Sequence, residues 1–172
     1  MSALATRPHR TSATNVSRAR SAQNVLPIVA AVDGSAASRA AIGEAVRLAD
    51  ELDAPVTFVY VRRGPAGFFG APVYQCRLTK QMAHAGRVLE RALAVANSAG
   101  VQAEGEILEG SARRRITEFA RDRGARLIVV GSRGRKLRQS VSTSVIRAAG
   151  RPVVVARSLP VLTSVAAAGN RM

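Results

Sequence analysis

Five short apolar runs alternate with stretches of helical periodicity between residues 25 and 157. Four of the runs are continuous rather than alternating, which is typical of strands buried on both faces of a sheet. Neighbouring parallel strands need a connection long enough to hold a helix. The pattern therefore predicts an α/β fold with a five-stranded parallel sheet and helices on both faces. The expected strands cover residues 25–32, 56–61, 101–108, 127–130 and 153–156.

Caps, glycines and periodicity mark the helices between these strands. Ser35 begins the first expected helix. The longest helix is expected over residues 78–96, after a Gly- and Pro-rich loop that covers residues 62–74. The other two are expected from Ser111 to Gly124 and over residues 140–149. The third apolar run alternates acidic with apolar residues, which indicates a half-exposed strand at a sheet edge.

Both ends of the chain differ from this middle part. Residues 1–24 hold four Arg, seven Ser or Thr and no acid, which predicts a disordered basic arm. Such a start also resembles an organelle transit peptide. Residues 158–172 predict a shorter C-terminal tail, so residues 25–157 are expected to form the one domain.

The charge of the chain is strongly positive. Lys and Arg number 26 against 11 Asp and Glu, for a net charge of +15. This balance favours an anionic partner, either a nucleic acid or a small molecule that carries phosphate. With two Tyr, four Phe and no Trp, the chain has few of the aromatic side chains on which binders of single-stranded nucleic acid stack bases.

Membrane, disulfide and metal-based classes are not expected. No run approaches the ~18 apolar residues of a membrane helix, and we expect a cytoplasmic protein with no membrane partner. Cys76 is the single cysteine, so no internal disulfide can form. With only His9 and His84 beside it, the thiol cannot complete a structural zinc site, and we expect no metal ligands.

Ligands of doubly wound sheets bind beyond the carboxyl ends of the central strands. Asp33 follows the first expected strand, residues 61–64 follow the second, and a loop with Gly131 and Gly134 follows the fourth. Glycines permit close backbone approach to an anion, and four basic residues of this loop add positive charge. The same loop is also consistent with a tight turn whose basic side chains are solvated.

Four motifs in register resemble the universal stress protein family over residues 25–157. The resemblance implies a flavodoxin-like sandwich, similar to the adenine nucleotide alpha hydrolases, with sheet order 3-2-1-4-5. It also implies a regulatory role in the stress response. The motifs are Val32-Asp-Gly-Ser35, Val129-Val-Gly-Ser-Arg-Gly134, Ser140-Val-Ser142 and Arg151-Pro-Val-Val-Val155.

ATP-binding members of the family are similar at particular positions, and ATP or another adenine nucleotide is the cofactor that the resemblance implies. The adenosine would lie near Asp33, the base would face Val61, and the phosphates would meet Gly131, Gly134, Ser140 and Val141. The family pattern has nine residues between the second Gly and a third Gly. Here four residues separate Gly134 from Gln139, which stands in the third Gly position. A loop shortened in this way predicts weak or absent ATP binding.

No set of residues indicates catalysis. A receiver domain would need further carboxylates around Asp33 to hold Mg²⁺, and no other strand end offers an acid. His84 is expected on the surface of the long helix, away from the point where the winding reverses. Nothing in the sequence pattern activates the Cys76 thiol. We therefore expect no enzyme and assign no catalytic residue.

Two functions remain open at this level. The first is a stress-linked regulatory module that senses a nucleotide or contacts a protein partner that the sequence does not identify. The second is a binder of nucleic acid or another polyanion, using the run Arg113–Arg115, the loop arginines and the N-terminal arm.

The last apolar run lies at a sheet edge in the order 3-2-1-4-5 and has neither charge nor internal proline to protect it. We expect a homodimer in which Val153, Val154 and Val155 pair with their copies about a two-fold axis, as the resemblance also implies. Alternatively, the C-terminal tail covers this edge of the sheet through Leu159, Val161 and Leu162.

Overall fold

The computed structural model describes residues 25–64, 71–132 and 141–157. Five parallel strands form one sheet, as the sequence pattern predicts, and their order β3-β2-β1-β4-β5 is the one that the resemblance implies. The strands are β1 (Ile28–Val32), β2 (Val56–Arg62), β3 (Ala103–Glu109), β4 (Leu127–Ser132) and β5 (Val153–Arg157). The helices are α2 (Ala36–Glu51), α3 (Ala71–Ser98), α4 (Ala112–Asp122) and α5 (Val141–Ala148).

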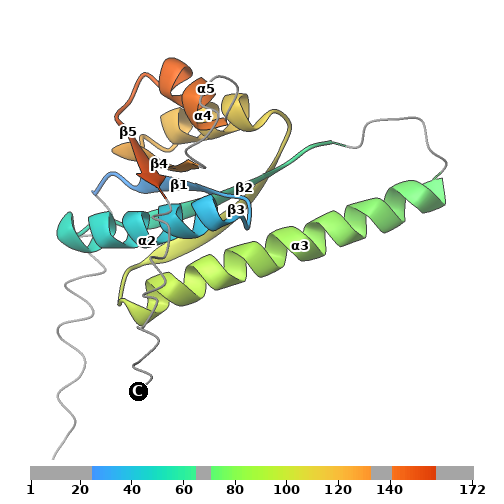
Figure 1. Cartoon of the computed structure of the whole chain (residues 1–172), viewed down its shortest axis with the longest axis horizontal. Coiled ribbons are helices and arrows are strands. Elements are labelled where there is room, and N and C mark those ends of the chain that lie inside the picture. The colour runs from blue at the N-terminus through green and yellow to red at the C-terminus, as the bar shows by residue number, and fades with distance from the viewer. Residues whose placement is uncertain (1–24, 65–70, 133–140, 158–172) are drawn as a thin grey trace, which may run out of the picture.

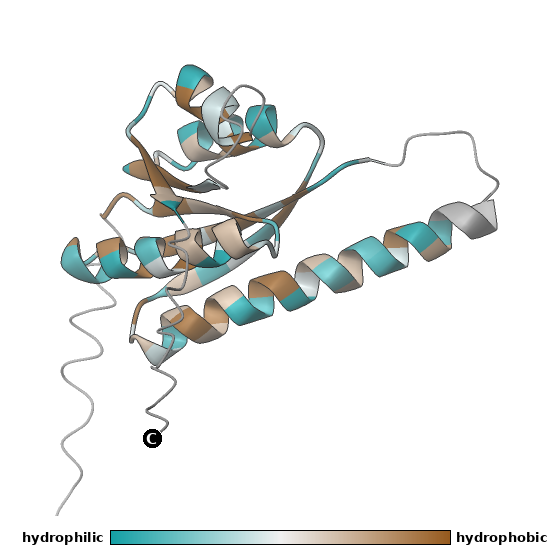
Figure 2. Cartoon of the chain, in the orientation of Figure 1, coloured by the Kyte–Doolittle hydropathy of each residue, from teal (hydrophilic) through white to brown (hydrophobic). Residues whose placement is uncertain are grey.

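Two apolar cores lie on opposite faces of the sheet. Because strand side chains alternate between faces, Ile28 and Ala30 pack under α2 and α3, whereas Val29 packs under α4 and α5. Figure 1 shows the two helical layers with the sheet between them, and Figure 2 shows that the apolar residues concentrate on the strands. Phe58 is the largest fully buried side chain and lies in the core under α2 and α3.

Strand β3 lies at one edge and is only partly buried, which confirms the prediction made from its alternating pattern. Its acidic residues on the α4 side are paired. The Arg123 guanidinium donates to Glu104 at 2.8 Å and to Glu106 at 3.1 Å, and it also lies 5.1 Å from the centre of the Phe119 ring. This edge is therefore covered with charge, which is how proteins discourage the pairing of further strands.

Helix α3 begins earlier than the sequence predicts. The prediction placed a loop over residues 62–74, but the helix starts at Ala71. The Gly- and Pro-rich composition between β2 and α3 hid this start, because Pro72 is tolerated in the first turn of a helix. The result is a helix of 28 residues, against 16 in α2.

The predicted arm of residues 1–24 and the predicted tail of residues 158–172 lie outside the described residues. In the part of the chain that is described, no helix is long and apolar enough to cross a membrane.

Candidate functional site

The turn between β1 and α2 is held by three hydrogen bonds. The Ser35 N–H donates to Asp33 Oδ1 at 2.9 Å, and the Asp33 N–H donates to Ser38 Oγ at 3.1 Å. The Ser38 N–H donates to Ser35 Oγ at 3.2 Å, so Ser35 caps the helix as predicted. Gly34 has a φ of +81°, a conformation that favours glycine. Asp33 itself is exposed at the end of the strand.

Gly131 lies near the carboxyl end of β4, against the start of α2. A Cβ atom at this position would lie 2.2 Å from the Ala37 carbonyl oxygen, much closer than any real contact. The first turn of α2 can therefore approach β4 only because residue 131 has no side chain. The Ser142 hydroxyl donates to the Gly131 carbonyl at 2.6 Å and ties the start of α5 to the same strand end.

These contacts bring two of the predicted site residues together. Asp33 and Gly131 both lie at the amino end of α2, where Ser38 meets the Asp33 N–H and Ala37 meets Gly131. The packing against Ala37 gives Gly131 a structural role that the sequence analysis did not anticipate.

The other predicted site residues lie elsewhere or cannot be placed. Val61 is half-buried and packs against the core under α4 and α5. Val141, the first residue of α5, is 48% exposed. Gly134, Ser140 and the shortened loop that ends at Gln139 lie outside the described residues.

His84 lies at the carboxyl end of β1, beside Gly34. The sequence predicted a position away from this end of the sheet. Its ring Nε2 would lie 3.6 Å from a Cβ atom built on Gly34, and its ring centre lies 5.9 Å from that of Tyr60. The prediction that His84 is a surface residue is confirmed, since the side chain is exposed. The sequence could not place His84, because its neighbours depend on the angle at which α3 crosses the sheet.

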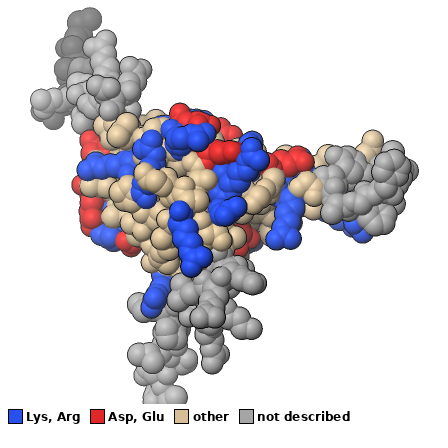
Figure 3. Space-filling view, turned by 90° about the horizontal axis from the view of Figure 1, so that it is seen from above, with Lys and Arg blue, Asp and Glu red and all other residues tan. Residues whose placement is uncertain are grey.

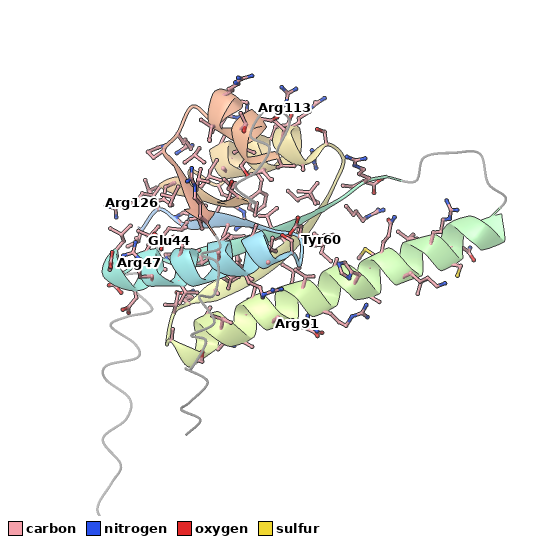
Figure 4. The ribbon with its side chains drawn as sticks, in the orientation of Figure 1. Glu44, Arg47, Tyr60, Arg91, Arg113 and Arg126 are labelled. Atoms are coloured by element: carbon pink, nitrogen blue, oxygen red, sulfur yellow. The ribbon has the colours of Figure 1, made fainter. Side chains whose placement is uncertain are left out.

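Tyr60 faces α3 and packs beside the core under α2 and α3, opposite to Val61. It stands in register with Val32, the residue before Asp33. Burial, and to a smaller extent the negative charge of Asp33, raises the pKa of the Tyr60 hydroxyl. Tyr60 and His84 therefore form a pair of aromatic rings beside the turn at Asp33 and Gly34. Figure 4 shows Tyr60 between the sheet and α3.

The side chains described at the carboxyl end of β1 are polar or aromatic. The described residues contain no group of three or more His, Cys, Asp or Glu side chains that could hold a metal ion. A helix amino end, a carboxylate and two rings are together suited to hold a small planar ligand that carries phosphate.

Comparisons with known proteins agree on one family. The model of the universal stress protein family matches residues 25–157. A universal stress protein of Mycolicibacterium smegmatis is 34% identical over 140 residues, which cover 74% of this chain and 47% of that relative. The chain thus spans about half the length of that relative.

Solved structures give the same result. The universal stress protein UspA of Lactobacillus plantarum aligns with a TM-score of 0.68 and 27% identity, over 77% of this chain and 97% of that one. A universal stress protein of Archaeoglobus fulgidus in complex with dAMP aligns with a TM-score of 0.60 and 25% identity, over 76% of this chain and 97% of that one.

Proposed function

Because this chain belongs to the universal stress protein family, we propose that it is a regulatory module of the stress response that binds an adenine nucleotide weakly and does not turn it over. The nucleotide occupies the carboxyl ends of β1 and β4, beside the amino end of α2. The cytoplasmic location expected from the sequence is kept in this proposal.

The arrangement around Asp33 and Gly131 is the observation that carries the proposal. Both residues meet the first turn of α2, whose N–H groups and dipole favour a negatively charged ligand. The relative from Archaeoglobus fulgidus has dAMP bound, which supports an adenine nucleotide as the ligand here.

The aromatic rings of Tyr60 and His84 lie on the α3 side of the proposed nucleotide site. Purine bases stack on aromatic faces, so the two rings support a site that holds the adenine or the ribose near Asp33. The resemblance instead puts the base at Val61, which packs on the opposite side of the sheet from Tyr60. Substitution of His84 distinguishes the two placements.

The length of the loop after β4 sets the expected order of affinities. In the sequence only four residues separate Gly134 from Gln139, so the contacts that the family pattern provides for a triphosphate are reduced. AMP, ADP and ATP should therefore bind with similar, weak affinities rather than with a preference for ATP.

Isothermal titration with AMP, ADP and ATP tests this function. The expected result is one weak site for each nucleotide, with affinities within about tenfold of each other, or 1.4 kcal/mol. His84→Ala should weaken AMP binding, and Arg126→Ala, an exposed position at the opposite end of the sheet, should not. Micromolar or tighter ATP binding would contradict the loop argument, and no binding of any nucleotide would contradict the site.

A further inference from the structure

Helix α3 extends well beyond the sheet that it covers. At 1.5 Å per residue it is ~42 Å long. Among the side chains of α3 that the structure describes, the first buried one is Ala85, and between Gln75 and His84 every side chain is exposed except Leu78, which is half-buried. Figure 1 shows this amino-terminal half as an arm that leaves the body of the domain.

One side of α3 carries a stripe of basic and imidazole side chains. The residues repeat every three or four positions, so they lie along one side of the helix. All of them are exposed, and the stripe extends over ~21 Å. We call this set the α3 stripe, and it consists of Arg77, Lys80, His84, Arg87 and Arg91.

Helices α2 and α4 pair several of their arginines with acids. In α2, Arg47 pairs with Glu44 at 2.6 Å. In α4, Glu118 accepts from Arg114 at 2.7 Å and from Arg115 at 3.3 Å, and Arg114 lowers the pKa of that carboxyl. Figure 3 shows acidic side chains beside several basic ones on the face that includes α4 and α5. Two of the three residues in the run Arg113–Arg115 are thus already paired.

Three members of the α3 stripe lack this compensation. Among the described residues, no acid lies within ion-pair distance of Lys80, Arg87 or Arg91. Glu90 is the single acid in the sequence of α3, and it pairs with none of them. Like charges three or four residues apart repel and destabilise a helix, and a polyanion laid along the stripe would remove that repulsion.

The dimensions of the arm match double-stranded DNA. A helix with its side chains is about 10–12 Å across, and the major groove is about 12 Å wide. A strand carries one phosphate per ~3.4 Å of axis, so the stripe faces about six successive phosphates of one strand. The guanidinium group of an arginine can donate two parallel hydrogen bonds to the oxygens of one phosphate. A lipid surface fits less well, because the free half of α3 offers only Leu78 and Met82 as large apolar side chains among those described.

From the charges of Lys80, Arg87 and Arg91, which have no ion pair among the described residues, and from the spacing and free length of α3, we propose that this helix is a DNA-binding arm that contacts the phosphates of a duplex through the α3 stripe. The contact is made to the backbone and is independent of base sequence. It uses a different surface from the nucleotide site, although His84 borders both.

Fluorescence anisotropy with a labelled 20-base-pair duplex tests the proposal in the full chain. The triple variant Lys80→Ala/Arg87→Ala/Arg91→Ala should bind about tenfold more weakly, and the slope of log affinity against log salt should fall by about 2.7. The control Arg113→Ala/Arg126→Ala/Arg147→Ala removes the same charge from exposed arginines that have no ion pair with any described residue, and it should stay within twofold of the unmodified protein.

Further results decide the outcome. If the two triple variants lost the same amount of duplex affinity, net charge alone would explain the binding, and the proposal would be overturned. Absence of duplex binding would overturn it too, as would tighter binding to phosphatidylserine vesicles or to a poly-glutamate peptide than to the duplex. Lys80→Arg keeps the charge and should keep the affinity. Circular dichroism should show that each variant is folded, as is expected for exposed positions.

Discussion

The ring of Tyr60 meets the ring of His84 edge-on, with 5.9 Å between the centroids and an angle of 71° between the planes. This contact joins β2 to α3 beside the turn that follows β1. A residue of β2, the strand beside the central β1, and a residue from the exposed part of α3 are therefore neighbours of Asp33 and Gly34.

Asp33→Asn should lower the pKa of Tyr60, which the Asp33 charge now helps to raise. The fall should be partial, because burial is the larger cause. The hydroxyl stabilises the fold fully below about pH 10, and this contribution is lost as the pH rises through the raised pKa. Tyrosinate absorbance measures the midpoint in a Tyr74→Phe background, where Tyr60 is the single tyrosine. An unchanged midpoint would show that the Asp33 charge does not reach the phenol.

Asp33→Ala should change the free energy of unfolding by no more than about 1 kcal/mol, the usual scale of one hydrogen bond. The carboxylate is exposed, and within the turn it accepts a hydrogen bond from the Ser35 N–H. AMP binding should weaken in the same variant. Urea unfolding measures the stability, and a collapse of the fold would show that Asp33 is structural.

Gly131→Ala should destabilise the protein by about 1–3 kcal/mol, because its Cβ would collide with the backbone of Ala37. Gly43→Ala is the matched control. Position 43 is exposed within α2 with nothing within 4 Å of an added Cβ, so alanine there should stabilise by about 0.5–1 kcal/mol. Thermal unfolding compares the two. Equal effects would show that the contact with Ala37 relaxes without cost.

Replacing residues 135–139 with nine residues followed by Gly should raise the affinity for ATP markedly and that for AMP much less. The longer loop restores the family spacing, in which glycine stands where this sequence has Gln139. Calorimetric titration of both nucleotides measures the ratio. A ratio that does not change would mean that loop length is not what limits ATP binding.

Val154→Lys should convert a dimer into monomers. Strand β5 lies at the edge of the sheet, and its valines are only half-buried along the described chain. A lysine on an edge strand opposes pairing with a second copy. Light scattering measures the mass. Leu26→Lys, at an exposed position outside the sheet, is the control and should leave the mass unchanged. An unmodified protein that is monomeric at high concentration would exclude the dimer.

The five strands and the helices between them were accessible from the sequence, because apolar runs and capping residues are local signals. The Ser35 cap and the half-exposed character of β3 are examples. The strand order came from the resemblance to the family. The start of α3 was not accessible, since Gly and Pro near Ala71 are equally typical of a loop and of a first helical turn.

Within the site, the role of Gly131 and the position of His84 could not be predicted, because both depend on tertiary contacts. The lack of a side chain at Gly131 lets the start of α2 approach β4. His84 lies beside Gly34 only because of the way α3 crosses the sheet. The α3 stripe, in contrast, had a signal in the sequence. Five residues repeat with helical spacing from Arg77 to Arg91, and a count of charge along each helix face would have found them.

The unequal packing along α3 divides the helix into two cooperative units. Amides before Ala85 should exchange hydrogen through local fraying, because few buried contacts oppose the opening of that part. Amides after Ala85 are tied to the core and should open only when the sheet does. The domain can therefore gain or lose about 20 Å of ordered helix while its core remains intact.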